Sequence, residues 1–226
     1  MKTFNFIMLA AASVSLSLSA CSSLGNSSDK SSAGIVAKTV IPAQIIRDEA
    51  EIKTNSNGEA VRLAKNDWFS FFVPKEWHVS VDAESDNEYK VYEFKIIPAV
   101  SSPKMASTIH LSYFSENNKD IATYQEFIRV NSQNVLRRGK TVEWEKYEPV
   151  SEKTVAGRKA FVVARNCRHF LHPNSKDDSF VMKKERIYVL PAQKGYYVIR
   201  YAADEDYFDK NLAAFEDIAS SFKGIY

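Results

Sequence analysis

The sequence predicts an α+β fold in which an antiparallel β-sheet is packed by two main helices. Several short segments alternate apolar and polar residues, as half-buried strands do. Glycine or proline stands between many of these segments, where tight turns can form. Two longer segments instead repeat apolar residues at helical spacing. These observations place the folded domain at residues 63–226, after a flexible N-terminal stem.

The first expected strands lie in the N-terminal half of the domain. Residues 68–73 are rich in aromatic and β-branched side chains, and Pro74 ends the segment. Residues 88–97 and 107–114 both alternate, which predicts antiparallel strands with one solvated face. On this pattern His110 falls on the solvated side of its strand.

Two hairpins are expected in the C-terminal half. The first joins residues 148–154 to 159–170 around Ala156-Gly157. The second joins residues 183–190 to 196–202, with Gly195 at the turn.

The two expected helices differ in their boundary signals. Asp120 can cap a helix that runs from Ile121 to Arg138 and ends at Gly139. A second helix is predicted from Asp204 to Lys223, with three acidic residues in its first turn, where the helix dipole favours them.

The N-terminus has the layout of a secretory signal peptide, residues 1–20. One basic residue, Lys2, precedes an apolar run and then a stretch of small residues that ends at Ala20. The sequence Leu18-Ser19-Ala20-Cys21 resembles the bacterial lipobox. The resemblance implies cleavage before Cys21, lipidation of its thiol and acylation, as with palmitate, of the new amino terminus. Ser22, in place of an Asp, favours the outer membrane, with the protein facing the periplasm, over the inner membrane.

Residues 21–62 are expected to form a lipid-anchored stem that is partly disordered. Residues 22–34 are almost wholly small or polar, as in a flexible tether. Residues 35–48 contain six branched apolar residues, which could pack on the domain itself or bind a partner.

Two stretches of the domain are similar to the PsbP-like superfamily, which includes Mog and DcrB-type lipoproteins. The first is Phe69-Ser-Phe-Phe-Val-Pro-Lys-Glu-Trp77, and the second is Tyr196-Tyr-Val-Ile-Arg-Tyr201 with the closing helix that ends at Phe222. The resemblance implies a PsbP-like α+β domain and a non-enzymatic binding or assembly role.

Composition and motifs favour neither nucleic-acid binding nor catalysis. The chain has 30 basic and 28 acidic residues, and losing Lys2 with the signal leaves a net charge of about +1. No G-x-S-x-G motif and no glycine-rich phosphate loop is present. We therefore expect no enzyme activity and no cofactor.

One cluster contains residue types that bind metals. Cys167, His169 and His172 are followed by Asp177 and Asp178. On a strand, residues 167 and 169 share a face and residue 172 points away, and the spacing matches no closed zinc pattern. No metal site is predicted.

The sequence thus predicts an anchored envelope protein that acts through protein contacts. The alternative is a lipoprotein that binds a small ligand or glycan through an aromatic pocket. Six basic and aromatic residues could form a platform on which a glycan or a protein stacks, or they could be core residues and cross-strand pairs. They are Arg186, Tyr188, Tyr196, Tyr197, Arg200 and Tyr201.

Overall fold

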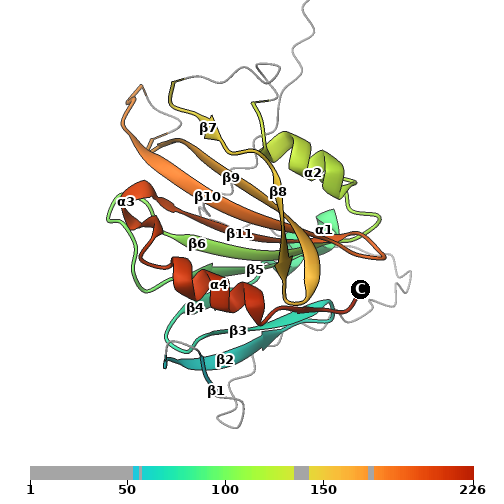
Figure 1. The fold of residues 1–226 in the computed structure, drawn as a ribbon. Coiled ribbons are helices and arrows are strands. Elements are labelled where there is room, and N and C mark those ends of the chain that lie inside the picture. The colour runs from blue at the N-terminus through green and yellow to red at the C-terminus, as the bar shows by residue number, and fades with distance from the viewer. Residues whose placement is uncertain (1–52, 56–57, 135–142, 173–175) are drawn as a thin grey trace, which may run out of the picture. The chain divides into compact units, whose positions relative to one another are not determined.

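A computed structural model describes residues 53–55, 58–134, 143–172 and 176–226 of the chain. Within these residues the strands form two antiparallel sheets, one of eight strands and one of four (Figure 1). Four helices accompany them, and none of the described helices is long and apolar enough to cross a membrane. The predicted α+β class with an antiparallel sheet is confirmed. The predicted signal peptide, Cys21 and residues 35–48 lie outside the described residues.

The larger sheet contains most of the domain. Its strands are β4 (His78–Ser80), β5 (Val91–Ile97), β6 (Thr108–Phe114), β7 (Lys146–Tyr147), β8 (Ser151–Val155), β9 (Arg158–Phe170), β10 (Phe180–Pro191) and β11 (Tyr196–Asp204). Their order is β4-β5-β6-β11-β10-β9-β7, and β8 also pairs with β9. Both predicted hairpins, β8–β9 and β10–β11, are present. β9, β10 and β11 extend beyond the predicted limits, whereas β8 begins three residues later than predicted.

Backbone geometry explains why glycine stands at the hairpin turns. Ala156 and Gly157 both adopt positive φ, at 49° and 75°. Gly195 also has a positive φ, and a Cβ there would lie 1.9 Å from the carbonyl oxygen of Phe114. Only glycine can occupy position 195 without displacing the neighbouring strand.

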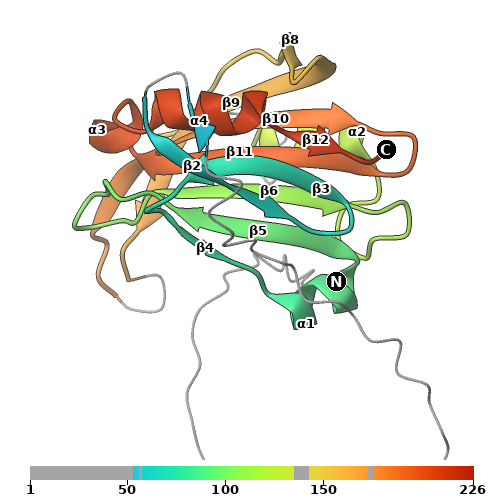
Figure 2. The same ribbon diagram turned by 90° about the horizontal axis from the view of Figure 1, so that it is seen from below.

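The smaller sheet brings the two ends of the domain together. It contains β1 (Lys53–Thr54), β2 (Ala60–Lys65), β3 (Phe69–Pro74) and β12 (Lys223–Gly224), in the order β1-β2-β3-β12. The chain's last strand therefore pairs with β3, and the C-terminus lies beside it (Figure 2). In the part of the chain that the structure describes, strand pairing is present from Lys53, ten residues before the expected domain start at residue 63.

The helix predicted from Ile121 to Arg138 begins later than expected. The observed helix α2 spans Tyr124–Asn131, and its N-cap is Thr123, whose hydroxyl accepts the Glu126 N–H, so the prediction of Asp120 as the cap is wrong. Residues 135–138 of the predicted helix lie outside the described residues. A further helix, α1 (Ala83–Tyr89), stands where the sequence predicted none.

The helix predicted from Asp204 to Lys223 is two helices, α3 (Glu205–Phe208) and α4 (Leu212–Ser220). In a continuous helix the Phe208 carbonyl would accept the N–H of Leu212. Here it accepts the Tyr201 hydroxyl instead, at 2.7 Å. The buried Asn211 side chain also donates to the carbonyl of Val100. These bonds to the rest of the domain replace one turn of the helix.

The larger sheet has a different apolar core on each side. We call the side that packs against the smaller sheet and α4 the core face, and the side under α2 the α2 face (Figures 1 and 2). Phe94, Leu111 and Ile199 belong to the main cluster on the core face. Phe114 and Val198 pack with Phe127 of α2 on the other side. Strand alternation therefore assigns every residue of β9 and β10 to one face or the other.

Candidate functional site

The two longest strands, β9 and β10, extend past their neighbours as a two-stranded ribbon. β11 pairs with β10 only from Lys183 onward, and β7 pairs with β9 only at residues 165–166. Among the described residues, the segments 167–170 and 180–182 therefore have only each other as partners. This hairpin end is at the upper left of Figure 1. Strands freed from the sheet in this way can present side chains to a partner.

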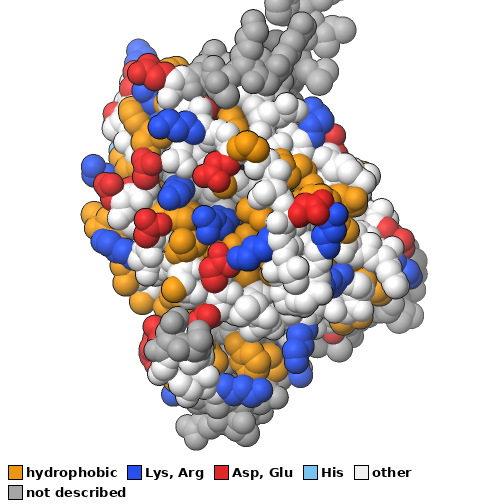
Figure 3. Space-filling view, viewed as in Figure 1, with side chains coloured by type: hydrophobic (Ala, Val, Ile, Leu, Met, Phe, Trp, Pro, Cys, Tyr) orange, Lys and Arg blue, Asp and Glu red, His pale blue; other side chains and the backbone are white. Residues whose placement is uncertain are grey.

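Aromatic side chains are exposed at the end of the ribbon. Phe170 and Phe180 pair directly in the register, and their ring centroids are 6.4 Å apart. They are 44% and 39% exposed. In the space-filling view, hydrophobic and charged side chains of both signs lie together at this end (Figure 3). Exposed aromatic residues with a charged rim are typical of interaction surfaces.

Arg168 completes this surface on the same face of β9. Its Cζ lies 4.2 Å from the ring centroid of Trp144 and 4.1 Å from that of Phe180. Trp144 comes from the turn before β7, and β7 is held by its pairing with β9. We call Trp144, Arg168, Phe170 and Phe180 the hairpin surface.

The loop that closes the hairpin has its own polar contacts. The Nε2 atom of His172 lies 3.6 Å from Oδ2 of Asp177, and the Ser179 N–H donates to Asp177. Hydrogen bonds from Ser179 lower the pKa of the Asp177 carboxyl. This carboxylate is therefore engaged within the loop.

The candidate metal residues lie apart from one another. Cys167 and His169 are on the α2 face of β9, opposite Arg168, and His172 is beyond the strand in the loop. Lys183 pairs with Cys167 in the register, and burial followed by the charge of Lys183 lowers the pKa of His169. The described residues include no group of three His, Cys, Asp or Glu side chains placed to hold a metal ion.

A buried charge cluster occupies the centre of the α2 face. The Glu185 side chain is 3% exposed, pairs with Arg165 and lies 3.0 Å from Lys183. Burial would raise its pKa, but the charges of Arg200, Arg165 and Lys183 outweigh burial and hold the pKa well below its usual range. The carboxylate is fully compensated, so the cluster has a structural role.

A second polar cluster contains serine, histidine and a carboxylate. One Glu93 oxygen lies 2.6 Å from Nδ1 of His110, and the other accepts the Ser112 hydroxyl at 2.6 Å. Burial would raise the pKa of Glu93, but these bonds lower it. The hydroxyl bonds to the carboxylate and not to the imidazole, so the nucleophile–base contact of a hydrolase triad is not made. The sequence pattern missed this cluster because its members are 17 and 19 residues apart; the pairing of Glu93 with Ser112 across β5 and β6 brings them together.

The tyrosines of the expected aromatic platform are core residues. Tyr188, Tyr196, Tyr197 and Tyr201 are all buried. Each hydroxyl donates a hydrogen bond: Tyr188 to Glu216, and the others to the backbone carbonyls of Ile121, Trp68 and Phe208. The alternative reading of these residues as core and cross-strand pairs is confirmed.

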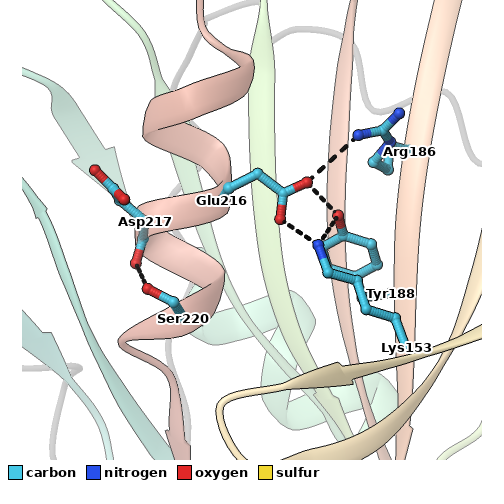
Figure 4. Close-up of polar contacts among 6 residues, drawn as sticks. All are labelled: Lys153, Arg186, Tyr188, Glu216, Asp217 and Ser220. Carbon is cyan, nitrogen blue, oxygen red and sulfur yellow. Dashed lines mark hydrogen bonds and ion pairs between the residues drawn. The ribbon is translucent and has the colours of Figure 1, made fainter. Parts of the chain in front are cut away.

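The remaining two platform residues are basic and serve other contacts. Arg200 donates to the buried Asn131 at 2.8 Å. Arg186 lies 3.4 Å from Glu216, which extends from α4 toward Tyr188 and Lys153 (Figure 4). The Lys153 ammonium is 2.7 Å from the same carboxylate. These contacts fasten α4 to β8 and β10.

A shallow groove of about 250 Å³ lies between α4 and the smaller sheet. Its lining includes Val61 and Phe72 from the sheet and Ile218 from the helix. Lys53 lies over the Phe72 ring at 4.7 Å. Phe72 is the sole aromatic side chain in the lining of this groove, so the groove is not the aromatic pocket considered from the sequence.

No protein-family model and no curated protein sequence matches the chain. Among solved structures, it is similar to the cyanobacterial PsbP protein CyanoP of Synechocystis sp. PCC 6803, with 11% identity and a TM-score of 0.46, over 73% of this chain and 92% of that one. It is also similar to LpqN of Mycobacterium tuberculosis, described as involved in cell envelope biogenesis, with 15% identity and a TM-score of 0.40, over 69% of this chain and 82% of that one. A Bacteroides thetaiotaomicron protein matches at 12% identity and a TM-score of 0.42, over 70% of this chain and 46% of that one. No residue role is transferred from these proteins.

Proposed function

We propose that this protein is a non-catalytic, lipid-anchored envelope protein that acts as a binding or assembly accessory through contacts with another protein. The hairpin surface is the observation that carries the proposal. It combines Trp, Arg and two exposed Phe side chains, and Trp and Arg are residue types that dominate the binding energy of protein interfaces. Because it is at the end of a projecting ribbon, a partner can reach it without rearranging the sheet.

The anchor is the second part of the proposal. Lipid attachment at Cys21 would hold the protein on a membrane, and the outer membrane, facing the periplasm, is our preferred location. Two or more acyl chains make such attachment stable, since each buried methylene contributes roughly 0.8 kcal/mol. The partner would then be an envelope protein within reach of the stem.

Site-specific photo-crosslinking in cells of the source organism tests the proposal. A photoreactive phenylalanine analogue at Phe170 or Phe180 conserves the exposed ring. We expect these positions to give a crosslinked species of defined mass. The same analogue at Arg129, an exposed residue of α2, should give none. If positions 170 and 180 form no specific crosslink, the proposal is wrong, and hydrolysis of an envelope substrate by the purified protein would then indicate an enzyme.

A second candidate function is supported by a separate group of rings. Trp68, Tyr92 and Tyr226 are each only half buried, and the Trp68 ring lies 4.8 Å from Tyr92 and 6.2 Å from Tyr226. Such rings can stack on a sugar, as in the alternative of a glycan-binding lipoprotein. Saturable quenching of tryptophan fluorescence by muropeptides that is lost in Trp68→Leu would favour this function.

A further inference from the structure

Arg168 differs from the other arginines that the structure describes. Six of the seven donate a hydrogen bond to a protein acceptor; they are Arg62, Arg129, Arg158, Arg165, Arg186 and Arg200. Arg168 has no hydrogen-bond or ion-pair partner among the described residues, and its Nε atom is buried. Its contacts are the rings of Trp144 and Phe180.

The ring contacts leave the terminal Nη donors of Arg168 without a protein acceptor among the described residues. Aromatic rings contact the flat face of a guanidinium, whereas its five N–H groups lie in its plane. An arginine held against rings is already ordered and partly stripped of water, so less side-chain entropy is lost when an acceptor binds. The planar fork matches a carboxylate, which can accept two parallel hydrogen bonds.

Two acidic residues that lie close to this surface in the chain are engaged elsewhere. Asp177 pairs with His172 and accepts the Ser179 N–H. Glu145, one residue after Trp144, accepts the Asn134 amide. The charge of Arg168 is therefore left for a group outside the described residues, and the exposed rings of Phe170 and Phe180 surround it with apolar surface.

We propose that Arg168 binds a carboxylate of the partner protein, and that an apolar side chain next to that carboxylate packs on Phe170 and Phe180. This proposal rests on the proposed function, because it assigns the chemistry of the partner that contacts the hairpin surface. The carboxylate is either an Asp or Glu side chain or a C-terminal group, since both offer the same two oxygens. A charge-assisted bond of this kind changes affinity by ~10- to 100-fold.

The first test uses the crosslinking analogue at Phe170 in the full-length protein. Combining it with Arg168→Gln should reduce the crosslink yield ~10-fold or more, and Arg168→Lys should reduce it less because the charge remains. Arg129→Gln is the matched control and should leave the yield unchanged. If the crosslink forms in the protein that keeps Arg168 and persists in Arg168→Gln, the carboxylate assignment fails while the proposed function stands. If no crosslink forms in the wild type, the proposed function itself fails.

The second test identifies the chemical source with defined probes. The Arg168 Nε–H resonance of the full-length lipidated protein in detergent micelles is followed by NMR, with acetyl-Leu-Asp-Leu-amide, its Asn counterpart, and acetyl-Leu-Leu with a free C-terminus. A saturable shift with the Asp peptide supports a side-chain carboxylate, and one with the free C-terminus supports a terminal carboxylate. Equal shifts with the Asp and Asn peptides would overturn the proposal. So would a shift with phosphatidylglycerol vesicles but with neither acid, which would indicate a lipid surface.

Discussion

At the residue scale, two arginines of β9 differ in their partners. One forms a buried ion pair inside the domain, and the other has a charge that a binding partner can use. Arg165 points to the α2 face, where it pairs with the buried Glu185. Arg168 is on the opposite face near the end of the ribbon and meets rings in place of an acid. Removing one partner of a buried ion pair typically costs about 3 to 5 kcal/mol, so Arg165 is needed for folding. Arg168 forms no ion pair with the described residues, so a contribution to binding explains its position better than a contribution to folding.

Asp86 provides a test of electrostatics at this same scale. It accepts the Glu93 N–H at 3.2 Å, and burial, followed by the nearby charges of Glu93 and Asp82, raises its pKa to about 7. The folded state therefore binds a proton between roughly pH 4 and 7 that the unfolded state has released. Stability from this group is greatest at low pH and falls as the pH rises through that range.

Asp86→Asn should remove this pH dependence, because the Asn side-chain oxygen can still accept the Glu93 N–H without ionising. At pH 8 we expect the variant to be about 1 to 2 kcal/mol more stable than the wild type, a value reduced for solvent screening of this partly exposed group. Urea unfolding at pH 5 and pH 8 measures the effect. A stability difference that is the same at both pH values would contradict the assignment.

At the element scale, α4 depends on one carboxylate that is shared by two strands. Glu216 accepts from Tyr188 of β10 and pairs with Lys153 of β8 at 2.7 Å (Figure 4). Burial would raise the pKa of Glu216, but the hydrogen bonds from Lys153 and Tyr188 lower it. The carboxylate form therefore fastens the helix to the core face.

Glu216→Gln should destabilise the domain by about 1 kcal/mol, because the ion pair is lost and the hydrogen bond to Tyr188 becomes neutral. The chain contains a matched control: Glu152 and Lys159 are also 2.7 Å apart, but both are more than half exposed. Glu152→Gln should change stability by less than about 0.5 kcal/mol. Equal effects of the two substitutions in urea unfolding would show that Glu216 does not fasten the helix.

Local patterns predicted both hairpins and the strands β3, β5 and β6, but not β1, β2, β4, β7 or β12. The hairpin turns at Ala156-Gly157 and Gly195 were predictable because positive φ demands particular residues. The helices were less predictable, since the break between α3 and α4 depends on Tyr201, which comes from another element. The hairpin surface was also not predicted. Alternation along β9 puts Arg168 and Phe170 on one face, but only the pairing of β9 with β10 and β7 brings Phe180 and Trp144 beside them.

At the scale of the whole molecule, the smaller sheet joins the beginning of the described chain to its end. β2 pairs with β3, and β3 pairs with β12, so the segment before residue 63 is part of the fold. Val61 and Ala64 of β2 are buried in the domain. The folded unit is therefore longer at its N-terminus than the sequence alone predicted.

Shortened chains test this boundary. A chain that begins at Leu63 loses β1, half of β2 and the buried Val61, all of which a chain that begins at Lys53 keeps. Burying one such side chain contributes about 1.5 to 3 kcal/mol, so the shorter chain should be at least that much less stable. Thermal unfolding compares the two. If they unfold at the same temperature, β1 and the start of β2 are dispensable.

The proposed anchor would decide where the whole molecule acts, and it depends on a single residue. Cys21→Ser removes the only thiol at the expected processing site, so lipid attachment should be lost and the exported protein should remain uncleaved or become soluble. Metabolic labelling with palmitate, followed by membrane fractionation, measures both outcomes. Cys167→Ser is the control, because Cys167 is partly buried in β9 and should not affect labelling. Palmitate label that persists in Cys21→Ser would rule out the lipobox, and the hairpin surface would then have to find its partner without a membrane to concentrate the protein beside it.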